Sequence, residues 1–380
     1  MRTQLKATAA VIAAGALCLT VAACGSDGSG DGGDRASDLT ASQQAAVEAA
    51  KASYEKFSAT QALDAVPPLP SAPPTGKTMT IITCSLPVCI TLSDGAADAA
   101  AKIGWKLTTL NSNSTPEGFV SAMNQVAANP PDALTYIGTL PDSSIKSQLA
   151  KIKAAGTKIV TISPIGDPLK EGSTVQAVSG GPADVAQSGK LMGDTVVADA
   201  NGPAKSVFVW DPTYAGVWGK IKTSYQEVLG SAGSKPGILE VSNANIGKTV
   251  PSQIVSYLQA HPDTEYVALA IVDYNTGLEA ALKAAGLAGK VKIVSRAANP
   301  SALKAIADGS QFASVGLELA GMAYRSVDQL ARLMMNVPLG DRLDKPGWQQ
   351  IYVKSNVTQT SEQPEPPDYV KAYTTAWHVG

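Results

Sequence analysis

The sequence predicts an α/β protein built from two doubly wound parallel-sheet lobes that face each other across a ligand cleft. Two observations support this prediction. Short β-branched segments alternate with Ala-rich amphipathic segments along most of the chain, a pattern typical of parallel sheets with helices on both faces. About 300 residues follow Lys77, which is too many for one small core and suits two lobes of ordinary domain size.

The individual elements follow from this alternation. In the first half of the chain, strands are expected at 78–83, 105–110, 133–137 and 158–163, and helices at 94–104, 117–128 and 143–155. In the second half, strands are expected at 206–210, 237–241, 266–272 and 290–295, and helices at 216–229, 251–260 and 277–285. Because ligands bind beyond the carboxyl ends of parallel strands, the loops after these strands are the candidate binding loops.

The N-terminus has the layout of a secretory signal, with a short basic region, an apolar run over 7–19 and the tetrapeptide Val21-Ala22-Ala23-Cys24. This tetrapeptide resembles the bacterial lipobox, whose cysteine becomes lipidated. We therefore expect a lipoprotein signal peptide over 1–23 and a lipid anchor on Cys24. The alternative is an ordinary signal peptide with a chance cysteine, or an uncleaved helix, although the apolar run is short for a span of roughly 20 residues.

Residues 24–76 are expected to form a tether, a short helix and a Pro-rich linker. Gly25 to Asp34 is almost wholly Gly, Ser and Asp, which predicts a flexible polar segment. Asp38 to Thr60 lacks Gly and Pro and predicts a helix capped by Asp38 or Thr40. Five prolines over 66–74 indicate a stiff spacer. In this interpretation everything before Lys77 delivers the folded part to its location.

Composition argues against several functions. With 30 basic and 32 acidic residues the net charge is -2, which offers no electrostatic basis for binding nucleic acid. His261 and His378 are the only histidines and lie far from any cysteine, so neither a metal site nor a general-base histidine is expected. No Gly-x-Ser-x-Gly motif occurs, and no cofactor is expected. An enzyme remains the remote alternative.

Several segments together carry a family resemblance. Their order and spacing resemble type I periplasmic binding proteins of the ribose and galactose kind, the sugar-binding lipoproteins of ABC transporters. The resemblance covers about residues 77 to 360, and its segments are Thr80–Thr83, Asp94-Gly95-Ala96, Lys102–Leu107, Asp132–Leu134, Ala154–Ile162, Leu282–Gly286, Ala305–Gly309 and Val353–Val357.

The resemblance implies a chain that passes between the lobes three times. One lobe would hold 77–200 plus 317–341, the other 204–315 plus 343–360, and 361–380 would be a C-terminal tail. The hinge would lie near Asn201, Gly316 and Gly340. Closure about this hinge would capture the ligand, since contacts from both lobes stabilise the closed form.

The expected function is therefore that of an extracytoplasmic solute-binding receptor. It would be lipid-anchored on the outer face of the bacterial cytoplasmic membrane and deliver a sugar-like or other small polar or aromatic molecule to ABC permease and ATPase subunits. A monomer is expected, without nucleic acid. The alternative is a ligand-sensing lipoprotein of the same fold that signals to a membrane partner.

Candidate ligand-binding residues lie in the loops after the strands. Aromatic faces stack on sugar or aromatic rings, while carboxylates, amides and arginine direct hydrogen bonds to polar groups. The candidates are Ser85, Leu86, Thr139 and Ser163 in the first lobe, Trp210, Asp211, Tyr214, Asn243, Asp273, Tyr274 and Arg296 in the second, and Glu318 near a crossover. The alternatives are that Asp273 caps a helix and that Arg296 forms a surface ion pair.

Two departures from the sugar-binding pattern bear on the ligand. Relatives usually carry an arginine at the helix start corresponding to 211–225, where this chain has only Lys220 and Lys222. They also tend to carry an aspartate after the strand ending at Ser295, where this chain reads Arg296-Ala297. A simple pentose or hexose is therefore in doubt, and an acidic, aromatic or modified ligand is equally compatible.

The remaining cysteines, Cys84 and Cys89, flank the loop after the first strand. In an oxidising compartment this pair could form a disulfide that stiffens a binding loop. Two free thiols facing the core are the alternative.

Overall fold

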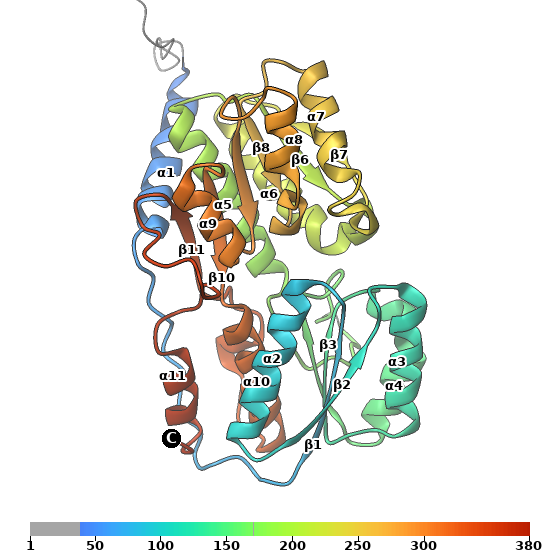
Figure 1. Cartoon of the computed structure of the whole chain (residues 1–380). Helices are drawn as coiled ribbons and strands as arrows, with labels where there is room; N and C mark the ends of the chain where they lie inside the picture. Colours follow the sequence, from blue (N-terminus) through green and yellow to red (C-terminus); the bar gives the residue numbers. More distant parts are fainter. Residues whose placement is uncertain (1–38, 170) are drawn as a thin grey trace, which may run out of the picture. The chain divides into compact units, whose positions relative to one another are not determined.

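The structure is a computed structural model and describes residues 39–169 and 171–380 (Figure 1). The predicted signal peptide, the lipid anchor at Cys24, the Gly-rich tether and Asp38 lie outside the described residues. Among the residues that are described, no helix combines the length and apolar character needed to span a bilayer.

Five parallel strands form the sheet of the first lobe. They are β1 (Thr78–Thr83), β2 (Lys106–Asn111), β3 (Ala133–Ile137), β4 (Lys158–Ile162) and β5 (Ala177–Ser179). Their order is β2-β1-β3-β4-β5, so the chain winds outward in both directions from β1. The first four agree with the predicted strands to within one residue, whereas β5 was not expected because Ala-Val-Ser is too short to show a strand pattern.

Helices cover both faces of this sheet (Figure 1). One face packs against α2 and α10, and the other against α3 with α4 beside it. Their bounds are α2 (Pro87–Lys102), α3 (Pro116–Ala128), α4 (Lys146–Ala154) and α10 (Leu319–Met334). Residues alternate along β1, so Ile81 joins the first core and Ile82 the second. The helix expected at 94 begins earlier because Pro87, which suits a first helical turn, opens it.

The second lobe contains a sheet of six strands. They are β6 (Ser206–Trp210), β7 (Gly237–Glu240), β8 (Tyr266–Leu269), β9 (Lys292–Arg296), β10 (Ala313–Leu317) and β11 (Gln349–Val353). The order is β11-β10-β9-β8-β6-β7, and only β11 runs antiparallel to its neighbour. The helix directly before β6 and the helices that connect the strands from β6 to β10 are α5 (Pro182–Ala200), α6 (Ala215–Ser231), α7 (Val250–Ala260), α8 (Leu278–Ala284) and α9 (Pro300–Asp308). The predicted fold class is confirmed.

The first crossing between the lobes differs from the expectation. It lies at Gly180 and Gly181, between β5 and α5, and not near Asn201. The reason is the packing of α5, whose buried Leu191, Met192 and Val196 join the core of the second lobe. Residues 182–200 therefore belong to the second lobe, and Asn201 only ends the helix in a left-handed conformation.

The remaining expected crossings lie close to their predicted places. The chain leaves the second lobe at Glu318, between β10 and α10, and returns between the short 3₁₀ helix Gly340–Leu343 and β11. Because α10 packs on β4 and β5 while β10 and β11 pair with each other, each passage is fixed by a packed element on both sides.

Both ends of the described chain add further passages. The helix α1 (Ala41–Ser58) packs on α5 and β11 of the second lobe, although the strand that follows it, β1, lies in the first. At the other end, α11 (Tyr369–Ala376) packs on α10 of the first lobe, although β11 precedes it (Figure 1). The predicted helix at 41–58 therefore belongs to the folded part of the chain, and 361–380 are no tail.

Buried side chains explain why the ends are structured. Val47 and Ala50 of α1 lie in the core of the second lobe, and Tyr373 and Trp377 lie in that of the first. The Pro-rich segment between α1 and β1 is also held in place, because the Leu69 N–H donates a hydrogen bond to Ala376 O of α11 at 2.8 Å. Thr40 caps α1 in a reciprocal bond pair with Gln43, as the sequence suggested.

Candidate functional site

The carboxyl ends of the parallel strands carry the polar side chains that the sequence singled out. In the second lobe, β6, β8 and β9 end in one aligned row, because Val209 pairs with Leu269 and Leu269 with Ser295. The loops that follow therefore start side by side, which is the arrangement in which parallel sheets bind ligands.

Asp211 holds two of these loops together. It is only 3% exposed, and its carboxylate accepts hydrogen bonds from Thr213 N at 2.9 Å and from Asn243 N at 2.8 Å. Tyr274 then donates its hydroxyl to Asn243 Oδ1 at 2.7 Å. The loops after β6, β7 and β8 are thus one hydrogen-bonded unit, and Asn243 Nδ2 is left buried without a partner.

An aromatic cluster lies on this unit. The rings of Tyr214 and Trp218 are 4.8 Å apart, and Trp218 meets Tyr274 edge-on at 6.1 Å. Trp218 and Tyr274 are buried, whereas Tyr214 keeps part of its ring open. Burial, with the nearby Asp211 carboxylate, raises the pKa of Tyr214, so its hydroxyl stays a hydrogen-bond donor at neutral pH.

Asp273 lines a cavity of about 310 Å³ that both lobes contribute to. The start of α2 supplies Pro87, Val88 and Thr91, and the second lobe supplies Ala297 and Asn299 beside Asp273. Burial raises the pKa of the Asp273 carboxyl, and its own backbone N–H lowers it in part. A largely buried carboxyl at a cavity wall is suited to accept hydrogen bonds from the hydroxyl or amino groups of a ligand.

Two other candidates are buried at the ends of strands, Trp210 in β6 and Arg296 in β9. The Trp210 ring lies under α6, with Lys222 Nζ 3.7 Å from its centroid, and Trp210 Nε1 has no partner. Arg296 is 6% exposed at the end of β9, and its Nε is likewise unpartnered. Burial lowers the pKa of Arg296, and the Asp184 carboxylate counteracts this.

Glu318 is fully buried where β10 passes into α10. It forms an ion pair with Arg325, whose Nη1 also donates to Lys345 O at 2.8 Å. Burial raises the pKa of the Glu318 carboxyl, and Arg325 lowers it. Oε1 is therefore engaged in holding the crossing, and only Oε2 lacks a partner.

The first-lobe candidates make contacts within their own lobe. Ser85 is exposed and donates to Asn111 Oδ1 at 3.2 Å, and Thr139 is partly buried after β3. Leu86 packs beside the disulfide, and Ser163 adopts a positive φ of 46° after β4. A non-glycine residue in that conformation is uncommon and indicates a constrained loop.

A disulfide joins Cys84 to Cys89 and ties the end of β1 to the first turn of α2. The pair packs with Leu92 and Met322 in a small core of its own. Since Pro87 and Val88 lie within this closed loop and line the 310 Å³ cavity, the disulfide fixes one wall of the candidate site.

The two lobes also touch at a second place. A Cβ on Gly216, at the start of α6, would lie 2.3 Å from Ile165 Cγ2 of the loop after β4, so only glycine permits this approach. Ile165 in turn packs against the core of the second lobe.

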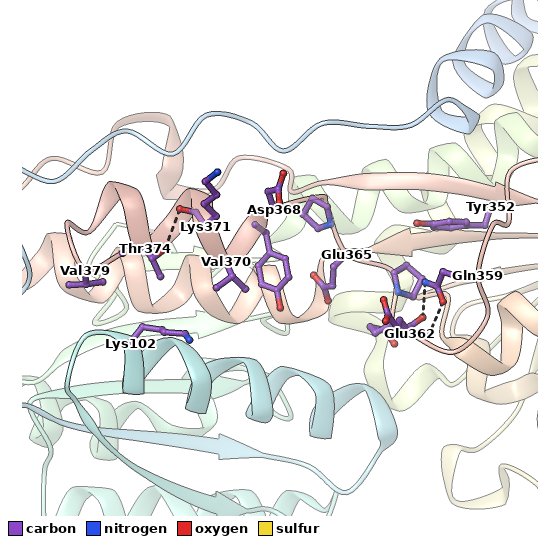
Figure 2. Close-up of a pocket in the computed structure, with 15 residues that line it drawn as sticks. Lys102, Tyr352, Gln359, Glu362, Glu365, Asp368, Val370, Lys371, Thr374 and Val379 are labelled. Atoms are coloured by element: carbon purple, nitrogen blue, oxygen red, sulfur yellow. Dashed lines mark hydrogen bonds between the residues drawn. The ribbon is translucent and has the colours of Figure 1, made fainter.

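Sequence reasoning missed the residues that complete the cavity. Val88, Thr91 and Asn299 gave no signal, because a helix start and a helix cap look alike whether or not a ligand lies nearby. A larger surface cavity of about 660 Å³ runs along the C-terminal segment, between Lys102 and Tyr352 (Figure 2). It contains none of the predicted site residues. Within residues 39–169 and 171–380, no group of three or more His, Cys, Asp and Glu is placed to hold a metal ion.

Comparison with known proteins identifies the family. The model of the periplasmic binding protein domain matches residues 83–336, which is more than half of the chain. The chain belongs to the periplasmic binding protein family. A search of the curated protein sequences finds no match to this periplasmic binding protein.

Solved structures agree with the fold of this periplasmic binding protein. GanP, a glucose-galactose binding protein from Geobacillus stearothermophilus, is 16% identical, with a TM-score of 0.65 over 75% of this chain and 100% of its own. A solute-binding protein from Burkholderia graminis in complex with D-arabinose is 18% identical, with a TM-score of 0.66 over 76% and 99%. The 5-methylthioribose-binding protein from Thermotoga lettingae is 15% identical, with a TM-score of 0.64 over 80% and 99%.

Proposed function

We propose that this protein is the extracytoplasmic solute receptor of an ABC importer and binds a small polar molecule between its two lobes. The observation that supports this most directly is the 310 Å³ cavity, because residues of both lobes line it and Asp273 brings a largely buried carboxyl to its wall. A ligand held there contacts both lobes at once, and such a ligand stabilises the arrangement in which the lobes are together.

The neighbouring loops add groups of the kind that such a ligand needs. Tyr214 offers a partly open aromatic face, and the buried amide of Asn243 has an unused N–H₂ group. Among the proteins with similar structures, one is described as a glucose-galactose binding protein, and others as a sugar transporter subunit or a solute-binding protein of an ABC transporter. We place the protein outside the cytoplasmic membrane, anchored through lipid on Cys24, and expect it to deliver its ligand to a permease with an ATPase subunit.

Thermal unfolding of the full chain against sugars, sugar acids, polyols, aromatic acids and nucleosides tests the proposal. A ligand at 100 times its Kd stabilises the fold by about 2.7 kcal/mol. Asp273→Ala should abolish the shift given by the best compound. Asp263→Ala, which removes an exposed carboxylate from the same lobe, should leave the shift intact.

Two results would count against a receptor. A flat response across the whole panel would favour a protein-partner role. Chemical turnover of a bound compound would make the protein an enzyme.

A further inference from the structure

Arg296 stands out among the charged groups of the described chain. The residue is 6% exposed, its Nε is buried without a hydrogen-bond partner, and no carboxylate among residues 39–169 and 171–380 forms an ion pair with it. A buried guanidinium N–H without a hydrogen bond is costly, because it loses its contact with water and gains no acceptor. Structural arginines of this chain behave differently, since Arg325 and Arg332 both bind carboxylates.

Asp184 is the charge that acts on Arg296, but its oxygens are already used. Oδ1 accepts from Gln349 Nε2 at 2.6 Å, and Oδ2 accepts from Gly347 N at 3.1 Å. Asp184 therefore eases the burial of the positive charge without satisfying its donors. The N–H groups of Arg296 remain available.

Arg296 is the last residue of β9, so it lies at the carboxyl end of the sheet, where the binding loops begin. One residue beyond the paired row of Leu269 and Ser295, Ala270 comes to lie beside Arg296, with Trp210 on its other side. Residues paired in this way share one face of the sheet, so Trp210 and Arg296 flank the small Ala270 at a separation of roughly 10 Å, two strand spacings. The next residue after Arg296, Ala297, lines the 310 Å³ cavity.

A second cation lies over the same face. Lys222 Nζ sits 3.7 Å from the Trp210 ring centroid and forms no ion pair within the described residues. This end of the sheet therefore combines two cations, Arg296 and Lys222, with Trp210 Nε1, which has no hydrogen-bond partner. All three groups are hydrogen-bond donors. Such a surface favours a negatively charged ligand group.

We propose that the solute carries a carboxylate and that Arg296 binds it, with the hydroxyl groups of the same molecule facing Asp273. The inference rests on the proposed function and narrows its ligand class to hydroxylated acids such as aldonic or uronic acids. A carboxylate is the matching partner for a guanidinium, because its two oxygens accept two parallel hydrogen bonds.

Isothermal titration of the full chain with matched pairs tests this. D-gluconate, D-glucuronate and D-galacturonate are compared with neutral D-glucose and D-galactose. We expect an acid to bind the wild type, and Arg296→Gln to weaken that binding about 10- to 100-fold, as the loss of a hydrogen bond to a charged group does. Lys304→Gln removes an exposed cation from the same lobe and should change the affinity by less than about twofold at physiological salt.

Two further measurements separate a ligand role from a structural one. Arg296→Lys keeps the positive charge but loses the two parallel N–H donors of the guanidinium. Its affinity for the acid should therefore lie between those of the wild type and Arg296→Gln. Without ligand, Arg296→Gln should unfold at the same or a higher temperature than wild type, because it removes an unsatisfied buried charge. A marked loss of ligand-free stability would show that Arg296 is structural and would overturn the inference.

The remaining outcomes tell the two proposals apart. If a neutral sugar binds as tightly as its acid, and Arg296→Gln binds that sugar equally well, the proposal of a carboxylate ligand is wrong. The proposed receptor function would be unaffected. If no compound of either set or of the wider panel binds the wild type, the receptor itself is contradicted together with the inference.

Discussion

Gln349 donates a hydrogen bond from Nε2 to Asp184 Oδ1 at 2.6 Å, which joins the first residue of β11 to the first turn of α5. Gln349 Oε1 also accepts from Ser188 Oγ at 3.1 Å, and all three side chains are buried. The two places where the chain enters the second lobe are therefore held against each other. A buried carboxylate that loses a donor here has no water to replace it.

Gln349→Leu tests this relationship. The substitution leaves Asp184 buried with one donor fewer, and we expect the free energy of unfolding to fall by about 1–3 kcal/mol. Urea denaturation followed by tryptophan fluorescence measures the change. Gln253→Leu on the exposed face of α7 is the control and should stay within about 0.5 kcal/mol of wild type. An equal effect of both variants would contradict the role given to Gln349.

The C-terminal helix should contribute strongly to stability. Trp377 is fully buried, stacks parallel to Tyr324 at 5.6 Å and donates Nε1–H to Asp328 Oδ1 at 2.9 Å. Trp377→Ala leaves a cavity and an underused carboxylate, and we expect a loss of about 3–5 kcal/mol in the free energy of unfolding. Ile90→Ala, at a side chain that is 53% exposed, serves as the control. A loss below 1 kcal/mol for Trp377→Ala would show that 361–380 is a tail after all.

The first helix should be part of the folded domain. Val47 and Ala50 are buried against the second lobe, and Ser53 Oγ donates to Asp194 Oδ2 at 2.5 Å. A chain shortened to begin at residue 77 should therefore unfold at lower urea than one that begins at residue 37, and with a smaller dependence on urea because less surface is buried. Identical urea curves would restore the view that α1 is only a spacer.

The sequence carried enough information for β1–β4, for β6–β9 and for the helices between them, because β-branched alternation and Ala-rich periodicity are local signals. It did not say which lobe a helix covers. The amphipathic pattern of α5 is the same whichever sheet it packs on. The first passage between the lobes was therefore expected near Asn201, after α5, whereas it lies at Gly180, before α5. The buried faces of α1 and α11 were missed for the same reason, since α1 packs on α5 and β11, more than 100 residues away in sequence, and α11 packs on α10 of the other lobe.

The candidate site shows a similar division. Strand ends are visible in the sequence, so Asp211, Asn243 and Asp273 were found as polar residues in the correct loops. Their roles depend on neighbours in space. Asp211 uses both carboxylate oxygens to hold loops, whereas Asp273 lines the cavity, and no local pattern distinguishes the two aspartates.

The disulfide should stabilise both the fold and the cavity wall. In the chain-entropy model a loop as short as Cys84 to Cys89 gives about 2 kcal/mol. We expect Cys84→Ser with Cys89→Ser to lower the free energy of unfolding by that amount and to weaken ligand binding, because Pro87 and Val88 lose their constraint. Dithiothreitol should do the same to the wild type and nothing further to the double variant. If dithiothreitol leaves the free energy of unfolding of the wild type unchanged, the stabilising role of the disulfide is refuted.

Glu365 should make stability depend on pH. Its two oxygens accept N–H groups at the start of α10, from Ala320 at 2.6 Å and from Gly321 at 3.0 Å, and it lies along the surface cavity of Figure 2. Burial raises the pKa of Glu365, the two N–H groups lower it and the Glu318 carboxylate raises it, and together these effects bring the pKa to about 8. In the unfolded chain the pKa returns to 4.5.

These two pKa values determine the direction in which stability changes with pH. The folded state holds the proton more tightly, so the stabilisation from Glu365 is complete below about pH 4.5 and is lost as the pH rises through about 8. Between these values the wild type should lose up to about 1.4 kcal/mol per pH unit relative to Glu365→Gln. Urea denaturation at intervals from pH 5 to pH 9 measures both proteins.

Glu362→Gln removes an exposed carboxylate from the same segment and should leave the pH profile of the wild type unchanged. If Glu365→Gln instead loses stability most at high pH, the carboxylate is charged in the folded protein. It would then cap α10 as an anion, because the backbone N–H groups would outweigh the cost of burial.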